Sequence, residues 1–168
     1  MRIDTARLAL TELADADAEF IRGLLNEPSF LRYIGDRGVR NVDDAKRYIQ
    51  DGPVAMYAKH GYGLLRVGLR PAGTPIGICG VLKRDALPEP DLGFSLLPAY
   101  WSRGYAFEAA AAVVHDVRRR LGIGRILAIT SPDNDASIRL LGKLGFRFER
   151  MMRLAEDAGE VRLFVSEP

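Results

Sequence analysis

The sequence predicts one mixed α/β domain over residues 1–168, with about seven strands in a mixed sheet and helices on both of its faces. Short apolar runs of strand length alternate with longer segments whose apolar residues recur every three or four positions. This alternation of strand, helix and strand is typical of a mixed sheet between layers of helices. The chain is also long enough for one domain with a proper core.

The first part of the chain is predicted to hold one strand and three helical segments. Residues 7–10 are short and apolar, which indicates a strand. Residues 12–26 carry apolar side chains at helical spacing. Asn41 suits the N-cap of the helix that follows it. Residues 53–60 form another short helix, which Gly61 ends.

The rest of the chain is predicted to hold six strands and two helices. The long helix covers residues 107–121, and its four consecutive alanines let it lie close to a sheet. A shorter helix over residues 136–144 ends at Gly145, a residue suited to the C′ position. The strands are expected at residues 62–70, 75–83, 92–97, 125–130, 146–154 and 161–165.

Composition and charge exclude several classes of protein. The formal net charge of +2 gives no reason to expect nucleic acid or another large polyanion as a partner. No run approaches the ~18 apolar residues that a membrane span needs, and residues 1–7 carry charges instead of the apolar core of a signal peptide. We therefore expect a cytoplasmic monomer or homodimer without membrane contact.

The cysteine and the possible metal ligands show no pattern of a reactive thiol or a metal site. Cys79 is the only cysteine, which excludes an internal disulfide and suits a reducing compartment. It lies within a predicted strand, and no cationic neighbour in sequence would lower its pKa, so we interpret it as a small core residue. No Asp, Cys or His group has the spacing of metal ligands, so we expect no metal.

The loop between residues 92–97 and the long helix has the features of an anion site. The first N–H groups of a helix have no partner inside it, and the helix dipole favours an anion near them. Gly104 and Ala106 keep bulky side chains off this loop. Neither a G-x-x-x-x-G-K-S/T nor a G-x-G-x-x-G motif occurs, which argues against an NTPase or a dinucleotide enzyme. The alternative is an ordinary strand–loop–helix joint.

Three segments of the chain resemble the GNAT superfamily of N-acetyltransferases. Residues 101–106, WSRGYA, resemble the Q/R-x-x-G-x-G/A signature of its acyl-CoA pyrophosphate loop, although Trp101 stands where Gln or Arg is usual. Residues 134–146, NDASIRLLGKLGF, resemble the family's N-x-x-S-x-x-L/V-x-x-K-x-G-F segment. Residues 32–40, RYIGDRGVR, are similar to the N-terminal segment of the branch of ribosomal-protein alanine and serine N-acetyltransferases.

This resemblance implies a twisted sheet, splayed where the central strand and the next strand part, with acetyl-CoA bound in that split as the co-substrate. The main chain of Ser95 and Leu96 would pair with the pantetheine arm, and one of these amides would bind the thioester oxygen as negative charge develops. Asn134 would hydrogen-bond the pantetheine. The pyrophosphate would be held by the amides of Trp101, Ser102, Arg103, Gly104, Tyr105, Ala106 and Phe107.

Four further residues of the predicted site have two interpretations each. The side chain of Arg103 either adds a charge beside the phosphates or is exposed to solvent. Ser137 either hydrogen-bonds the sulfur of CoA as it leaves or only caps the start of a helix. Glu89 and Asp91 are the best candidates for a base near the acceptor, or else two solvated loop carboxylates.

Phe30 and Tyr33 belong to an apolar cluster that ends at Gly35. Such a cluster is most often part of a core. In the resembled family, the region between the first two helices lines the acceptor pocket, so both residues are also candidates for contact with the substrate.

The reaction that the resemblance implies is attack of an amine on a thioester, which only a neutral amine can perform. An α-amine has a pKa near ~8 and a lysine side chain near ~10.4, so roughly a tenth of the α-amine but under about a thousandth of the lysine is neutral at pH 7. Because the sequence offers no compelling base, we predict an N-acetyltransferase for the N-terminus of a protein. The alternatives are a small-amine acetyltransferase, for a polyamine, amino acid or drug, and a non-enzymatic module that binds acyl-CoA.

Overall fold

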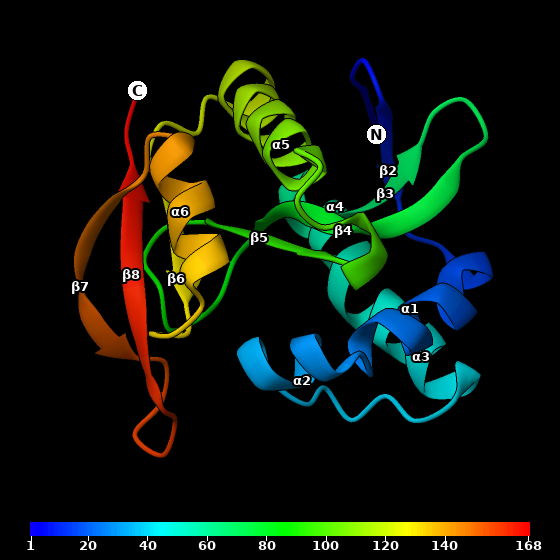
Figure 1. The fold of residues 1–168 in the computed structure, drawn as a ribbon, viewed down its shortest axis with the longest axis horizontal. Coiled ribbons are helices and arrows are strands. Elements are labelled where there is room, and N and C mark those ends of the chain that lie inside the picture. Colours follow the sequence, from blue (N-terminus) through cyan, green and yellow to red (C-terminus); the bar gives the residue numbers. More distant parts are fainter.

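Eight strands form one sheet in the order β1-β2-β3-β4-β5-β6-β8-β7, and the computed structural model describes all 168 residues (Figure 1). All neighbouring strands are antiparallel except β5 and β6, so the predicted mixed sheet is confirmed. The unpredicted strand, β1, has only three residues, too few to show a period. The strands are β1 (Arg2–Asp4), β2 (Leu8–Glu12), β3 (Leu64–Leu69), β4 (Thr74–Leu82), β5 (Asp91–Leu96), β6 (Ile126–Thr130), β7 (Arg147–Arg153) and β8 (Glu160–Ser166).

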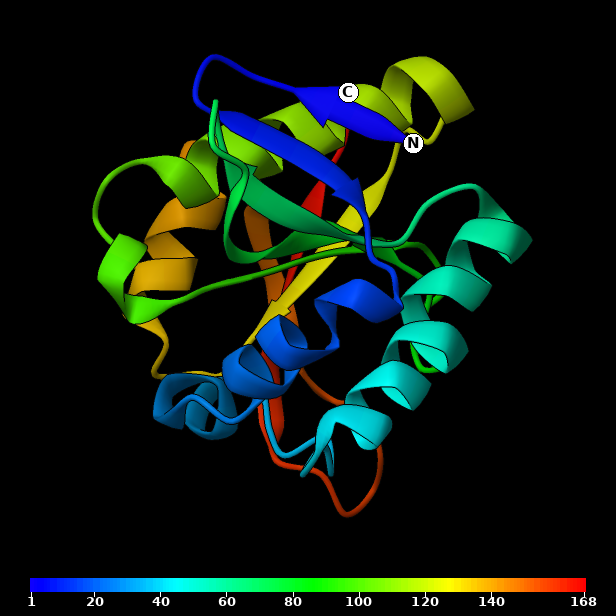
Figure 2. The ribbon, with the colours of Figure 1, turned by 90° about the vertical axis from the view of Figure 1, so that its right-hand side faces the viewer.

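The helices lie on both sides of the sheet, as predicted. Figure 2 shows α5, in yellow-green, on one side and α1 and α3, in blue and cyan, on the other. None of the helices combines the length and the apolar character that crossing a membrane requires. The helices are α1 (Ala18–Leu25), α2 (Pro28–Tyr33), α3 (Val42–Ile49), α4 (Ala55–His60), α5 (Tyr105–Leu121) and α6 (Asp135–Lys143).

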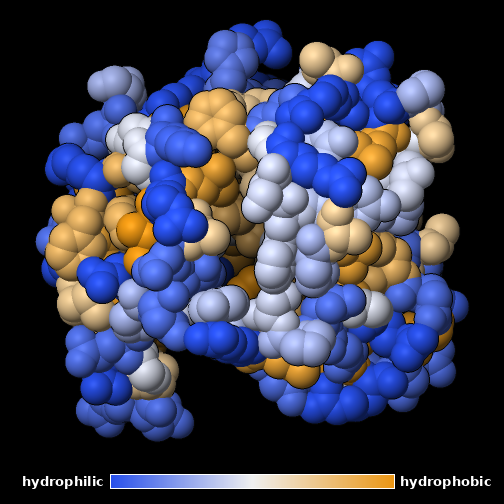
Figure 3. Space-filling view, in the orientation of Figure 1, coloured by the Kyte–Doolittle hydropathy of each residue, from blue (hydrophilic) through white to orange (hydrophobic).

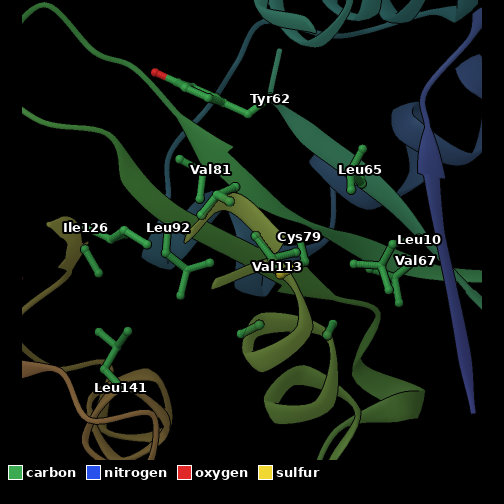
Figure 4. Packing of buried hydrophobic residues seen from close by; sticks show 14 of the residues in the cluster. Leu10, Tyr62, Leu65, Val67, Cys79, Val81, Leu92, Val113, Ile126 and Leu141 are labelled. Carbon is green, nitrogen blue, oxygen red and sulfur yellow. The ribbon is translucent and has the colours of Figure 1, made fainter. Parts of the chain in front are cut away.

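Alternating side chains of β4 divide the core into two clusters on opposite faces. Cys79 belongs to the cluster under α5, whereas Ile78 belongs to the cluster that α1 and α3 cover. Ala109 and Ala110 of α5 have no exposed surface, so the alanine run brings the helix onto the strands as expected. Cys79 is also fully buried, and burial raises the pKa of its thiol. Figure 4 shows it beside Val113 of α5, which confirms a small core residue.

Two prolines mark places where the structure departs from the prediction. Pro28 opens α2 at a first-turn position, where a missing N–H costs nothing, so the segment after α1 is helical. Pro53 lies in a π-helical turn, Gln50–Val54, that joins α3 to α4 without a break. Asn41 caps α3 as predicted, and its side chain accepts a hydrogen bond from the Asp44 N–H at 2.8 Å.

Strands β5 and β6 meet at one pair of residues and then part. Asp91 lies opposite Leu127, and the Leu127 N–H donates to the Pro90 carbonyl at 2.9 Å. Residues 93–96 of β5 have no partner strand on this side. The sheet is therefore splayed at the place that the family resemblance implied, and one edge of β5 stays open.

Candidate active site

The split in the sheet opens into a cleft of about 1530 Å³. Strand β5 and the loop before α5 line one wall, β6 and α6 line the other, and α2 with residues 48–56 closes one end. Figure 3 shows a hollow between the two halves of the molecule, with hydrophobic residues deep inside it. The cleft therefore offers a polar rim and an apolar floor to a long ligand.

Six consecutive N–H groups at the start of α5 have no partner in the protein. The first main-chain hydrogen bond of the helix runs from the Glu108 N–H to the Gly104 carbonyl at 3.0 Å, and residues 102–107 donate none. The Trp101 N–H donates to the Pro98 carbonyl at 3.2 Å. The predicted row of free amides is thus present but begins one residue later, at Ser102.

The backbone of this loop is shaped to gather those amides. Gly104 has a φ of 81°, and Ser102, with a φ of 59°, is the one non-glycine residue of the chain with a positive φ. Left-handed residues in a turn direct successive N–H groups into one concavity, which binds anions. The 17-residue helix that follows adds the positive end of its dipole.

Trp101 ties the loop to the end of β5. Its indole Nε1 donates to the Leu96 carbonyl at 2.9 Å, although about half of its surface is exposed. In the resembled signature this position is usually Gln or Arg. The Leu96 carbonyl therefore already has one partner, whereas its N–H is free for a ligand.

The phase of β5 favours Phe94 over Ser95 as a ligand contact. The Leu97 N–H donates to the Ile76 carbonyl of β4 at 2.8 Å, and an antiparallel strand alternates the direction of its peptide groups. Ser95 therefore turns its peptide groups toward β4. Phe94 and Leu96 turn theirs toward the split. The prediction that the main chain of Ser95 pairs with a ligand is wrong. An apolar run predicts that a strand forms, but not which of its peptide groups face which neighbour.

Arg7 braces the loop from outside the cleft, a role that the sequence analysis missed. Its Nη1 donates to the Arg103 carbonyl at 3.0 Å, and its guanidinium lies 4.4 Å from the centre of the Tyr105 ring. Its Nε pairs with Glu108 at 2.9 Å. Thr5 donates its hydroxyl to the same carboxylate at 2.7 Å. Partial burial by itself would raise the pKa of Glu108, but the hydrogen bonds from Thr5 and Arg7 hold that pKa below its ordinary value.

Positive side chains line the cleft, but the predicted Arg103 is not among them. Arg103 is exposed and its side chain does not line the cleft, so the solvent-exposed interpretation holds. Arg139 and Lys143 of α6 do line it. No motif identified them in the sequence, since their place depends on α6 lying across the split.

Helix α6 presents Asn134 and Ser137 to the cleft. The Asn134 Oδ1 accepts from the Ser137 N–H at 3.3 Å, so Asn134 is the cap of the helix. Its side-chain NH₂ group remains free to donate. The Ser137 hydroxyl makes no hydrogen bond in the protein, which contradicts the interpretation of Ser137 as a capping residue.

The two candidate bases are both engaged elsewhere. Glu89 does not line the cleft and pairs with Arg125 at 3.3 Å, which contradicts a base role for Glu89 there. Asp91 does reach the cleft, but it has no exposed surface, and both of its oxygens accept from the Arg84 Nε at 3.1 and 3.2 Å. Burial raises the pKa of Asp91, and Arg84 opposes that rise. No cluster of His, Cys, Asp or Glu side chains forms a possible metal site.

Phe30 and Tyr33 of α2 both line the cleft. Phe30 is also part of the second core cluster and only 4% exposed, which confirms its core role and leaves contact with the substrate a prediction. The Ser131 hydroxyl donates to the Tyr33 carbonyl at 2.7 Å, and Arg32 pairs with Asp133 at 3.3 Å. These contacts join α2 to the loop after β6 across the mouth of the cleft.

The sequence of the chain is similar to known acetyltransferases. Residues 7–147 match the family model described as an acetyltransferase (GNAT) domain. Over 153 residues the chain is 31% identical to the N-acetyltransferase YoaA of Bacillus subtilis, which is itself uncharacterised. The match covers 90% of this chain and 85% of that relative.

Solved structures share the fold over the full length of the chain. An acetyltransferase from Agrobacterium tumefaciens superposes with a TM-score of 0.85 at 24% identity, covering 100% of this chain and 95% of that one. A ribosomal α-N-protein acetyltransferase in complex with coenzyme A superposes with a TM-score of 0.83 at 17% identity, covering 99% and 98%. At these identities the superpositions show the fold alone.

We predict that Arg7 and Glu108 are energetically coupled in the fold. In a double-mutant cycle of Arg7→Gln, Glu108→Gln and the double variant, urea unfolding should give a coupling of about 1 kcal/mol, because a charge-assisted pair holds two distant segments together. The pair Arg22 and Glu19, both on α1 and exposed, serves as the control and should couple more weakly. If the effects of Arg7→Gln and Glu108→Gln on the free energy of unfolding were simply additive, the bracing role would be contradicted.

Proposed function

The chain belongs to the acetyltransferase (GNAT) family, and from this premise we propose that it moves the acetyl group of acetyl-CoA to the α-amine at the N-terminus of a protein. The observation that carries the proposal is the row of six free amides at residues 102–107 beside the open edge of β5, in one cleft. A pyrophosphate suits the first feature, and an extended chain of amides suits the second.

The residues of the cleft fit acetyl-CoA along its length. The amides of residues 102–107 would hold the pyrophosphate, and Arg139 and Lys143 would add positive charge beside the phosphates. The Leu96 N–H and the Phe94 carbonyl would pair with the pantetheine arm as an added strand would. The side-chain NH₂ of Asn134 would donate to a pantetheine carbonyl.

In the proposed reaction the neutral amine attacks the thioester carbon in a ternary complex. A C–N bond forms and the C–S bond breaks; the nitrogen gives its proton to water, and CoA leaves as a thiolate that takes up a proton. The Phe94 N–H, which faces the split and lies farther along β5 from the amide row than Leu96, would donate to the thioester oxygen as it becomes negative. The free hydroxyl of Ser137 would hydrogen-bond the departing sulfur.

The state of the two predicted bases supports an α-amine as acceptor. Glu89 lies outside the cleft and Asp91 is buried against Arg84, so neither reaches an incoming amine without rearrangement. An α-amine is already about one-tenth neutral at pH 7 and needs little help from a base. The relative solved with coenzyme A is a ribosomal α-N-protein acetyltransferase, which agrees with this acceptor.

Two other functions remain as alternatives. A small amine such as a polyamine or an amino acid also fits a cleft of this size. A non-catalytic module would use the same amides to bind acyl-CoA without turnover. All three functions require acetyl-CoA binding, but only the two enzymes transfer the acetyl group, and they differ in the acceptor. Measurements of acetyl-CoA binding and of acetyl transfer to different acceptors therefore separate them.

We predict that Gly104→Val abolishes acetyl-CoA binding while the protein stays folded. Valine disfavours a φ of 81° and puts a branched side chain where the phosphate would approach. The control is Gly73→Val, because Gly73 has a φ of 82° in the β3–β4 turn, outside the cleft. Acetyl-CoA should raise the Tm of the wild type and of the control only. Equal shifts in both variants would remove the loop assignment, and no shift in the wild type would remove all three functions.

We predict that a peptide N-terminus is acetylated faster than any lysine side chain or polyamine near pH 7. Release of free thiol from acetyl-CoA measures kcat/KM for each acceptor at the same concentration. A peptide and its N-terminally blocked form make a matched pair, and only the first should react. Faster turnover of spermidine or free lysine than of every peptide would favour the small-amine alternative.

We predict that Ser137→Ala lowers kcat about ten- to a hundredfold while the affinity for acetyl-CoA stays nearly unchanged. This is the pattern of an interaction made mainly in the transition state. Because the hydroxyl has no partner in the protein, the Tm should also stay unchanged. A normal kcat in this variant would show that the departing sulfur receives no help from Ser137.

A further inference from the structure

The end of the cleft near the start of β5 holds a cationic group that the proposed acetyl transfer does not use. Arg37 lies in the loop of residues 34–41 and lines the cleft. Two neighbouring arginines of the cleft are neutralised, since Arg32 pairs with Asp133 and Arg84 pairs with Asp91. Arg37 forms no ion pair, so one positive charge is left over at this end.

The loop around Arg37 is built to hold it in place. Val39 is buried in the second core cluster, and its carbonyl accepts from the Asn26 side chain at 2.8 Å. The Asp36 carboxylate accepts from the Gly38 N–H at 2.8 Å and pairs with Arg40. Hydrogen bonds from Arg40 and Gly38 lower the pKa of Asp36 to about 2. These contacts on both sides of Arg37 fix the backbone and leave its side chain free.

Further donors line the same cleft. Tyr48 of α3 lines it, and its hydroxyl has no hydrogen-bond partner in the protein. Burial raises the pKa of Tyr48, and the positive charges of Arg37 and Arg84 oppose that rise. Tyr48 also packs against the second core cluster, which contains Val39. Arg84 uses its Nε for Asp91 and leaves its two Nη atoms free. By contrast, Lys83 donates to the carbonyls of its own loop.

We propose that Arg37, with Tyr48 and the Nη atoms of Arg84, binds a carboxylate of the acceptor. This inference rests on the proposed function, and it names the acceptor class as a protein N-terminus with an acidic side chain at its second or third residue. Asp91 lies three residues before Phe94, which is about 10 Å along the strand. A carboxylate two residues after the reacting amine spans a similar distance in an extended peptide.

The test compares two peptide acceptors that differ only in having glutamate or glutamine at both the second and third positions. Their C-termini are amidated, so that the glutamates carry the only negative charges. The wild type should acetylate the glutamate peptide with a kcat/KM about tenfold higher, as expected for a charge-assisted contact in a partly exposed cleft. This preference should shrink as the salt concentration rises.

Arg37→Gln should remove most of the preference by lowering kcat/KM for the glutamate peptide alone. Tyr48→Phe should reduce it less. The matched control is Arg47→Gln, since Arg47 is an exposed arginine of α3 that pairs with Asp44 and does not line the cleft. It should keep the full preference.

Equal kcat/KM for the two peptides in the wild type would overturn this inference and leave the proposed function intact. An Arg37→Gln variant that slows both peptides equally would also overturn it. No acetylation of either peptide, with acetyl-CoA still raising the Tm, would overturn the protein N-terminus as acceptor and the acidic preference with it.

Discussion

The candidate site depends on the failure of β5 and β6 to pair beyond Asp91 and Leu127. Main-chain N–H and C=O groups need hydrogen-bond partners, and a continuous sheet would have supplied them from β6. Because the strands part, the peptide groups of Phe94 and Leu96 face a cleft. The loop before α5 starts at the end of the same strand, so the free edge and the free amides open onto one space. The parting of the two strands therefore brings both features of the candidate site to one cleft.

The one carboxylate in the first turn of α5 is neutralised by neighbouring side chains. Glu108 lies in the first turn of α5, where a free carboxylate would repel a bound anion. Arg7 and Thr5 neutralise it by ion pairing and hydrogen bonding, and Arg7 also fixes the Arg103 carbonyl and the Tyr105 ring. The proposed anion site thus combines a local loop with an arginine that directly precedes β2. At the proposed acceptor site, Arg32 and Arg84 are paired, whereas Arg37 forms no ion pair.

Features set by neighbours in sequence could be predicted from the sequence. Asn41 caps α3, and the alanines of α5 lie against the sheet. Most of the strands were found because they are long enough to show their apolar character. The three-residue β1 and the proline-opened α2 show no such period and were missed.

Features set by contacts distant in sequence could not be predicted. Arg7 and Glu108 are 101 residues apart, and no local pattern relates them. Glu89, between β4 and β5, pairs with Arg125, which directly precedes β6, and so lies outside the cleft. The choice between Phe94 and Ser95 depends on the register of β5 against β4, and a run of apolar residues carries no register.

A crystal structure of the chain with acetyl-CoA tests the central claim most directly. The account predicts pyrophosphate oxygens about 3 Å from amides of residues 102–107, with the pantetheine arm paired to Phe94 along the open edge of β5. The Trp101 amide should keep its bond to Pro98. A pyrophosphate bound away from this loop, or a pantetheine arm that does not follow β5, would contradict it.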